Sequence, residues 1–167
     1  MNSLLKRLIL TIGLFIYSWG LYAQDSTKFW NEIPSPLGWV SDFEGDFTLS
    51  EIQSLEGIIK DFEKRTSIEI AVITIPKWAV SKGDFEDLSL KIARAWKVGK
   101  KKKNNGILIA VSKGHRMIRI QNGSGVQDEI SDSETKRIID EVIIPQFKQD
   151  QYYLGVFEGI LEIVKNI

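Results

Sequence analysis

The chain has 167 residues, of which 43% are apolar and 26% are charged, and it contains no cysteine. This composition is typical of one globular domain with a substantial core, and it excludes disulfides, thiolate metal sites and a cysteine nucleophile. Basic and acidic residues number 22 each, so we find no general electrostatic reason for the chain to bind nucleic acid.

The first 23 residues have the pattern of a secretory signal peptide. Two basic residues precede an apolar run over residues 8–22, and the small residue Ala23 stands before the expected cleavage point. An uncleaved anchor is the alternative, but a spanning helix needs about 20 apolar residues, and this run is shorter and is interrupted by Ser18 and Gly20. Cleavage leaves a net charge of −2, because it removes two basic residues and no acidic one. We therefore expect an exported protein, periplasmic or secreted.

A linker is expected over residues 24–35, and a single folded domain over residues 36–167. Pro34, Pro36 and Gly38 interrupt regular structure at this boundary. We expect the mature chain to be soluble, without a transmembrane helix, and we also expect it to be monomeric.

The first helix of the domain is expected to begin at Thr48, which forms an S/T-x-x-E capping box with Glu51. Apolar residues then recur at helical spacing up to about Thr66: Leu49, Ile52, Leu55, Ile58, Ile59 and Phe62. Residues 68–76 are rich in β-branched residues and continuously apolar after Glu69, which predicts a central strand covered on both faces.

The second half of the domain is expected to contain a helix after Asp84, a hairpin of two strands, and two further helices. The hairpin joins residues 107–111 to residues 116–121 through a tight turn. A second capping pattern at Ser131 predicts a helix that stops at Pro145, and a last helix covers residues 152–166. This order predicts an α/β fold, a three-layer αβα sandwich with a small mixed sheet and helices on both faces.

Two loops of small polar residues are expected at one end of the hairpin, around residues 104–106 and 122–125. Gly123, Ser124 and Gly125 follow a strand and precede a helix, so we consider them as a phosphate or ligand loop. Asp128 occupies the place of the third glycine of a dinucleotide fingerprint, and we expect no nucleotide cofactor. Asn122 occupies the first glycine position of a hydrolase elbow, which favours Ser124 as a turn residue.

Other polar residues allow more than one interpretation. The lysine run over residues 100–103 is either a solvated loop or a patch for phosphate or anionic lipid. His115 is the only histidine, which excludes a multi-histidine zinc site and favours an exposed turn residue. Asp42, Glu44 and Asp46 alternate as in a calcium loop, but the twelfth position counted from Asp42 is a glutamine, so an EF-hand is excluded. A different calcium site, formed by one of these carboxylates and loop carbonyls, is an alternative to a role in helix entry and turn formation.

Six segments, in this order and spacing, resemble the TPM-domain family over about residues 36–164: Val40–Asp42, Ile70–Thr74, Ala95–Gly99, Asn105–Ile109, Arg116–Ile120 and Tyr152–Gly155. The plant members of this family work in the thylakoid lumen during photosystem II repair, and bacterial relatives are exported. The resemblance implies an αβα sandwich, an acidic pocket that binds divalent metal in some members, and weak phosphatase activity.

The resemblance also implies a metal site, for which Asn104, Asn105, Asp132 and Asp42 are the candidate ligands. The family usually has aspartate where this chain has Asn104, so we expect weaker metal binding. Calcium is favoured over zinc because every candidate ligand atom is an oxygen. A right-handed crossover between the two central strands would place Asp42 at the opposite sheet end, so the other three residues are preferred.

Two functions follow from these observations. The first is an exported soluble binding or assembly and repair factor for membrane-protein complexes, with a protein partner and weak calcium binding. The alternative is a metal-assisted phosphatase of low activity, in which loop amides and the lysine run hold the phosphate.

Overall fold

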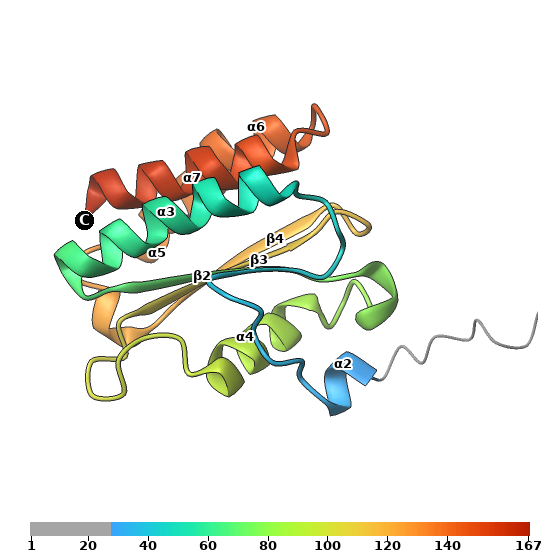
Figure 1. Cartoon of the computed structure of the whole chain (residues 1–167), viewed down its shortest axis with the longest axis horizontal. Helices are drawn as coiled ribbons and strands as arrows, with labels where there is room; N and C mark the ends of the chain where they lie inside the picture. Colours follow the sequence, from blue (N-terminus) through green and yellow to red (C-terminus); the bar gives the residue numbers. More distant parts are fainter. Residues whose placement is uncertain (1–27) are drawn as a thin grey trace, which may run out of the picture.

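The computed structural model describes residues 28–167, and the expected signal peptide lies outside this part of the chain (Figure 1). A single four-stranded sheet forms its centre, in the order β1-β2-β3-β4. The strands are β1 (Val40–Asp42), β2 (Glu69–Thr74), β3 (Gly106–Ser112) and β4 (Met117–Asn122). The first three are parallel and β4 is antiparallel to β3, so the sheet is mixed, as predicted.

Helices cover both faces of this sheet (Figure 1). One face carries α3 (Leu49–Thr66), α5 (Asp132–Arg137), a π-helical segment (Ile138–Ile143), α6 (Ile144–Phe147) and α7 (Tyr152–Asn166). The other face carries α2 (Lys28–Asn31) and α4 (Phe85–Trp96), with a short 3-10 turn at Lys77–Ala79. A second 3-10 turn, Ser124–Val126, follows β4. The predicted αβα sandwich is therefore confirmed.

The alternating side chains of β2 explain its continuous apolar sequence. Ile70 and Val72 belong to the core below α3 and α7, whereas Ala71 and Ile73 belong to the core against α4. Successive residues of a strand point to opposite faces, so a strand between two helical layers must be apolar at every position.

The capping box of α3 forms as predicted, since the Thr48 side chain accepts from the Glu51 amide and the Glu51 carboxylate accepts from the Thr48 amide. Leu49, expected on the buried face, is instead 80% exposed. It lies about 120° around the helix from the buried Leu55, at about 100° per residue, and so points away from the sheet.

The helix that begins after Ser131 does not stop at Pro145, contrary to the prediction. Its backbone widens into a π-helix, in which the amide of Ile144 donates to the carbonyl of Ile139, five residues back. A new helical turn then starts around Pro145, where a missing amide hydrogen is tolerated. The chain reaches Phe147 before it turns. α7 packs closely here, because Cβ atoms on Gly155 and Gly159 would press on the side chains of Phe147 and Ile143.

Part of the segment expected to be a linker is packed against the domain. Phe29 is buried and makes edge contacts with Phe43 and Trp78. The indole Nε1 of Trp96 donates to the Pro34 carbonyl at 2.7 Å. The folded unit therefore includes residues 28–35. Among residues 28–167, no helix combines the length and apolar character needed to cross a bilayer.

Candidate functional site

The two loops at the amino-terminal end of β3 are joined by backbone hydrogen bonds. Gly123 donates to the carbonyl of Gly106 at 2.8 Å, and Gly125 donates to that of Asn104 at 3.0 Å. A Cβ atom on Gly123 would overlap the Asn104 carbonyl, and one on Gly125 would overlap the Lys103 carbonyl. The prediction that these loops meet is confirmed. The two glycines are needed for close backbone approach, and their amide hydrogens are already used.

A groove of about 690 Å³ lies between these loops and the end of α4. Its polar side chains come from Arg94, Lys97, Lys101, Asn104, Gln121, Asn122 and Ser124, and none of its lining residues is acidic. Arg94, Lys97 and Lys101 make no ion pair within residues 28–167. We call this feature the basic groove.

Lys97 ends α4 in a left-handed conformation, with φ of 55°. Its amide donates to the carbonyls of Ala93 and Arg94, which closes the last turn of the helix. The chain then turns sharply through Gly99, whose φ is 99°, and the lysine run follows. The cap therefore places Lys97 and Lys101 on the same groove as Arg94.

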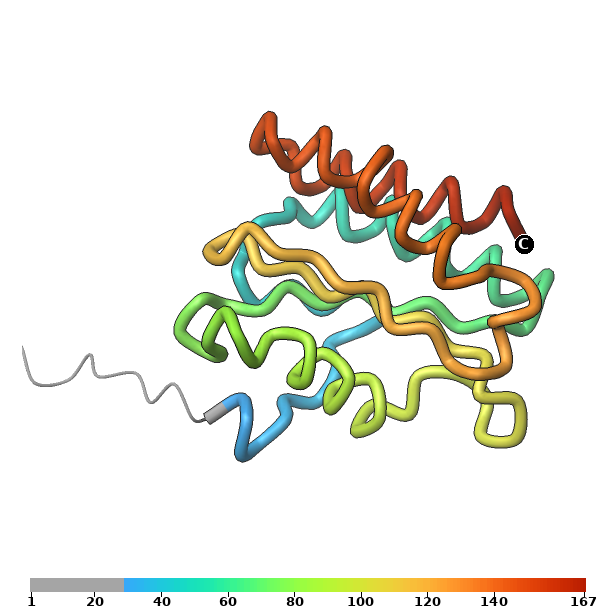
Figure 2. The backbone as a smooth tube through the Cα atoms, turned by 180° about the vertical axis from the view of Figure 1, so that it is seen from behind, coloured from blue at the N-terminus to red at the C-terminus, as the bar shows by residue number. Residues whose placement is uncertain are grey.

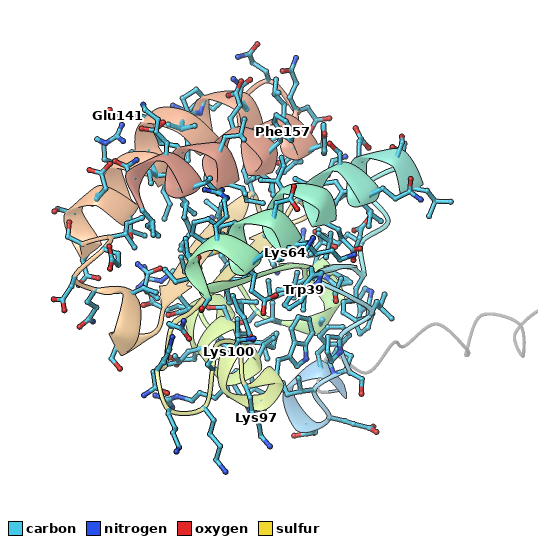
Figure 3. The ribbon with its side chains drawn as sticks, turned by 60° about the vertical axis from the view of Figure 1, so that its left-hand side comes forward. Trp39, Lys64, Lys97, Lys100, Glu141 and Phe157 are labelled. Atoms are coloured by element: carbon cyan, nitrogen blue, oxygen red, sulfur yellow. The ribbon has the colours of Figure 1, made fainter. Side chains whose placement is uncertain are left out.

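Lys100 has a structural role that separates it from the rest of the lysine run. Its ammonium group bonds to Glu63 at the end of α3 and to Glu69 at the start of β2, both at 2.6 Å. Both hydrogen bonds raise the pKa of Lys100, and the bond to Glu63 has the larger effect. Figure 3 shows Lys97 at the end of α4 and Lys100 nearer to α3. The remaining three lysines of the run are exposed.

Asn105 is buried and both polar atoms of its side chain are bonded. Its Oδ1 accepts from the amide of Lys100 at 2.9 Å, and its Nδ2 donates to the carbonyl of Ser67 at 2.7 Å. Asn105 thus fastens the lysine loop to the end of α3. Asn104, by contrast, lines the basic groove in a left-handed conformation, with φ of 48°.

The other two predicted metal ligands lie elsewhere. Asp132 begins α5 and is exposed beside a separate hollow. Asp42 ends β1 at the opposite end of the parallel strands, as its predicted position required. Its carboxylate accepts from the Gly45 amide at 3.0 Å, the Phe47 amide at 2.8 Å and the Thr74 hydroxyl at 2.5 Å.

The four predicted ligands are therefore not gathered around one point. Within the described chain, no three His, Cys, Asp or Glu side chains are grouped closely enough to hold a metal ion. Calcium binding remains a prediction that rests on the family resemblance.

The hairpin tip at the other sheet end is held by polar contacts. Glu44 accepts from the amides of Lys113 and Gly114, at 2.9 and 3.2 Å, and its burial raises the pKa of the carboxyl group. His115 is half-buried, with its Nε2 2.8 Å from the Val80 carbonyl, and is not the exposed turn residue that we expected. Its ring packs against the loop after β2, which the turn sequence alone did not indicate.

Sequence analysis missed Arg94 and Lys97 as groove residues. One signal was available, because residues 88–127 contain no acidic side chain. That stretch includes the end of α4, the lysine loop, β3 and β4. Folding brings its two ends together at the basic groove without any carboxylate to neutralise them.

The sequence profile of the TPM domain matches residues 40–166, and the chain therefore belongs to the TPM-domain family. Two solved structures have a similar fold and related sequence. The N-terminal domain of a protein from P. gingivalis is 30% identical, with a TM-score of 0.70, over 77% of this chain and 80% of that one. The BA42 protein from the psychrophilic bacterium Bizionia argentinensis is 29% identical, with a TM-score of 0.63, over 74% and 83%.

A third structure, the N-terminal domain of cg2496 from Corynebacterium glutamicum, has a TM-score of 0.60 over 77% of this chain and 79% of that one. At 16% identity, this similarity supports the fold alone. A comparison with curated protein sequences gave no match.

Proposed function

We propose that this chain is an exported, non-catalytic binding factor that acts in the assembly or repair of membrane-protein complexes. In this proposal, the basic groove receives an acidic group of the protein partner. The observation that carries the proposal is the charge of the groove, which has three basic side chains without ion-pair partners among the described residues and no acidic lining residue. The family resemblance supports the role in complex assembly.

The groove suits an anion for two physical reasons. A concave surface with charges of one sign concentrates the electrostatic potential and attracts ligands of the opposite sign. The side-chain amide of Asn104 and the hydroxyl of Ser124 add neutral polar groups around these charges. Carboxylates and phosphates accept hydrogen bonds from such groups as well as from Arg and Lys.

The alternative, a weak phosphatase, has less support from the same groove. Phosphate hydrolysis needs a group that activates water or a nucleophile, and the lining contains no carboxylate or imidazole for this task. Ser124 supplies a hydroxyl, but within residues 28–167 no hydrogen bond joins it to a general base. We therefore propose that the groove binds an acidic group and does not hydrolyse a phosphate ester.

The test is an NMR titration of the purified, isotope-labelled chain with a hexaglutamate peptide at low salt. We expect amide shifts around residues 97–104 and 121–124, and none with hexalysine. Lys97→Gln and Lys101→Gln should each weaken binding by about two- to fivefold, the usual value of one exposed ion pair. Lys82→Gln, at an exposed position outside the groove, is the matched control.

Two results would contradict the proposal. One is binding of hexaglutamate with equal affinity to the parent and to the Lys97→Gln/Lys101→Gln double variant. The other is turnover of p-nitrophenyl phosphate that calcium increases and Ser124→Ala abolishes, which would favour the phosphatase.

A further inference from the structure

The outer edge of β4 has no neighbouring strand in the described part of the chain. The hydrogen bond from Gly123 to Gly106 shows which residues of β4 face β3, because bonded pairs alternate along an antiparallel ladder. Met117, Arg119 and Gln121 therefore point their backbone groups toward β3. The amide and carbonyl groups of the other three residues point outward: Ile118, Ile120 and Asn122. No hydrogen bond joins these outward groups to another residue of the described chain.

A groove runs along this edge, between β4 and the helical segment 132–147, which lies above β4 in Figure 2. It consists of two hollows that share Ile118 and Ile139. The first, of about 590 Å³, is lined by apolar and aromatic residues, among them Ile144, Phe147 and Tyr152, and also by the charged residues Arg116, Lys148 and Asp150. The second, of about 610 Å³, is polar and is also lined by Asn122, Asp132, Thr135 and Lys136. We call the two together the edge groove.

We propose that the edge groove binds an extended segment of a partner polypeptide, which adds a fifth strand beside β4. Unpaired amide and carbonyl groups on an edge strand are a template for such pairing. The backbone supplies three outward donors and three outward acceptors, and an extended peptide is the ligand that matches their spacing. This site shares Gln121 and Asn122 with the basic groove but does not depend on an acidic ligand.

The two hollows also specify the side chains of the bound segment. Alternate residues of a strand lie on one face, about 7 Å apart. A residue opposite Ile118 faces the hollow formed with Ile139 and Phe147, so it should be apolar. A residue two positions along lies opposite Ile120, which is itself buried in the core. A residue opposite Asn122 faces the polar hollow and should be polar.

A second copy of this chain is a poorer match for the edge groove. If the β4 strands of two copies pair antiparallel and use all three outward residues, Ile120 lies opposite Ile120 of the second copy. Asn122 of the second copy then lies opposite Ile118. That polar side chain would face the apolar hollow. Asn122 also donates to Thr135 within its own chain at 2.7 Å, so it is held away from a new partner. The groove therefore favours a segment of different sequence.

The experiment begins with the purified chain and a display library of random twelve-residue peptides. We expect selected peptides that alternate apolar and polar residues, and the strongest binder then serves as the probe. Hydrogen exchange followed by NMR reports on the edge directly. In the free protein, the amides of Ile118 and Asn122 should exchange faster than those of Arg119 and Gln121, and the bound peptide should slow them by about tenfold or more.

Two substitutions test the two parts of the site. Ile118→Pro removes one outward donor, together with a side chain that lines both hollows, and leaves the bonds to β3; Ile139→Lys places a charge in the apolar hollow. Each should lower the affinity for the probe peptide by about tenfold, the equivalent of one lost hydrogen bond or apolar contact. Val142→Lys is the matched control, because Val142 is half-buried on the same π-helical segment but outside the groove. Lys97→Gln should also leave the affinity unchanged.

Three outcomes would overturn the proposal. The selected peptide could leave the Ile118 and Asn122 amides unprotected, or Ile139→Lys could bind it as well as Val142→Lys does. Alternatively, the chain could self-associate in sedimentation experiments and lose this association in Ile118→Pro, which would make a second copy the occupant. Circular dichroism of each variant separates these results from loss of the fold.

Discussion

Substitution of Asn105, next to the basic groove, tests whether its side chain has a structural role or a ligand-binding role. Its buried side chain makes two hydrogen bonds, and Asn105→Ala removes both. The amide of Lys100 and the carbonyl of Ser67 then lose their partners. Each bond contributes about 1 kcal/mol, and the partly buried groups left without a partner add a further cost, so the free energy of unfolding should fall by about 2–4 kcal/mol.

For a domain of this size, 1 kcal/mol corresponds to about 3 °C in the melting temperature, so the expected loss is about 6–12 °C. Thermal unfolding followed by circular dichroism measures this directly. Asn104→Gly is the matched control, since it changes the neighbouring amide at a position with positive φ that glycine adopts without strain. The control should melt within about 3 °C of the parent. If Asn105→Ala melts within about 2 °C, the side chain is not structural and is free to serve as a ligand.

Four further outcomes are expected. Gly106→Val should destabilise the fold by about 2 kcal/mol or more in urea unfolding, because a Cβ atom there would overlap the Val98 carbonyl, and unchanged stability would refute the close approach. Burial raises the pKa of Glu44 in the folded state, so the folded protein binds a proton that the unfolded chain releases. The free energy of unfolding should therefore fall as pH rises above 4.5. Glu44→Gln should reduce this fall in denaturant titrations. The family resemblance predicts weak calcium binding near Asn104, with Kd on the order of 10⁻⁴ to 10⁻³ M, although the basic side chains of Arg94, Lys97 and Lys101 oppose it; Asn104→Asp should tighten it in NMR titrations, and no shifts in either protein would end the metal hypothesis. Mass spectrometry of the exported protein should find an amino terminus near Gln24, whereas an intact leader in the membrane fraction would indicate an anchor.

The parts of the fold that could be predicted from sequence are those that depend on local spacing. The capping box at Thr48 lies within four residues, and the two-sided burial of β2 follows from its own uninterrupted apolar sequence. The hairpin was predictable because its turn joins two adjacent strands. These features fixed the fold class and the meeting of the two loops.

The site could be predicted only in part, because its side chains form hydrogen bonds with residues far away in sequence. Asn105 bonds to Ser67, 38 residues earlier, and His115 contacts Val80, 35 residues earlier. No local sequence pattern predicts either contact. The groove likewise depends on the left-handed end of α4 at Lys97, which directs the following lysines to the same side as Arg94.

The π-helical segment has a consequence for how this domain tolerates change. Thr135, before this segment, contacts β4, while Ile143 at its end and Phe147 after it fit against Gly159 and Gly155 of α7. The wider turn contains one extra residue, so the helix after it is rotated by about 100° about its axis relative to the helix before it. A one-residue deletion here would restore an ordinary helix and turn Ile143 and Phe147 away from the two glycines. The sequence of the segment can therefore vary more readily than its length.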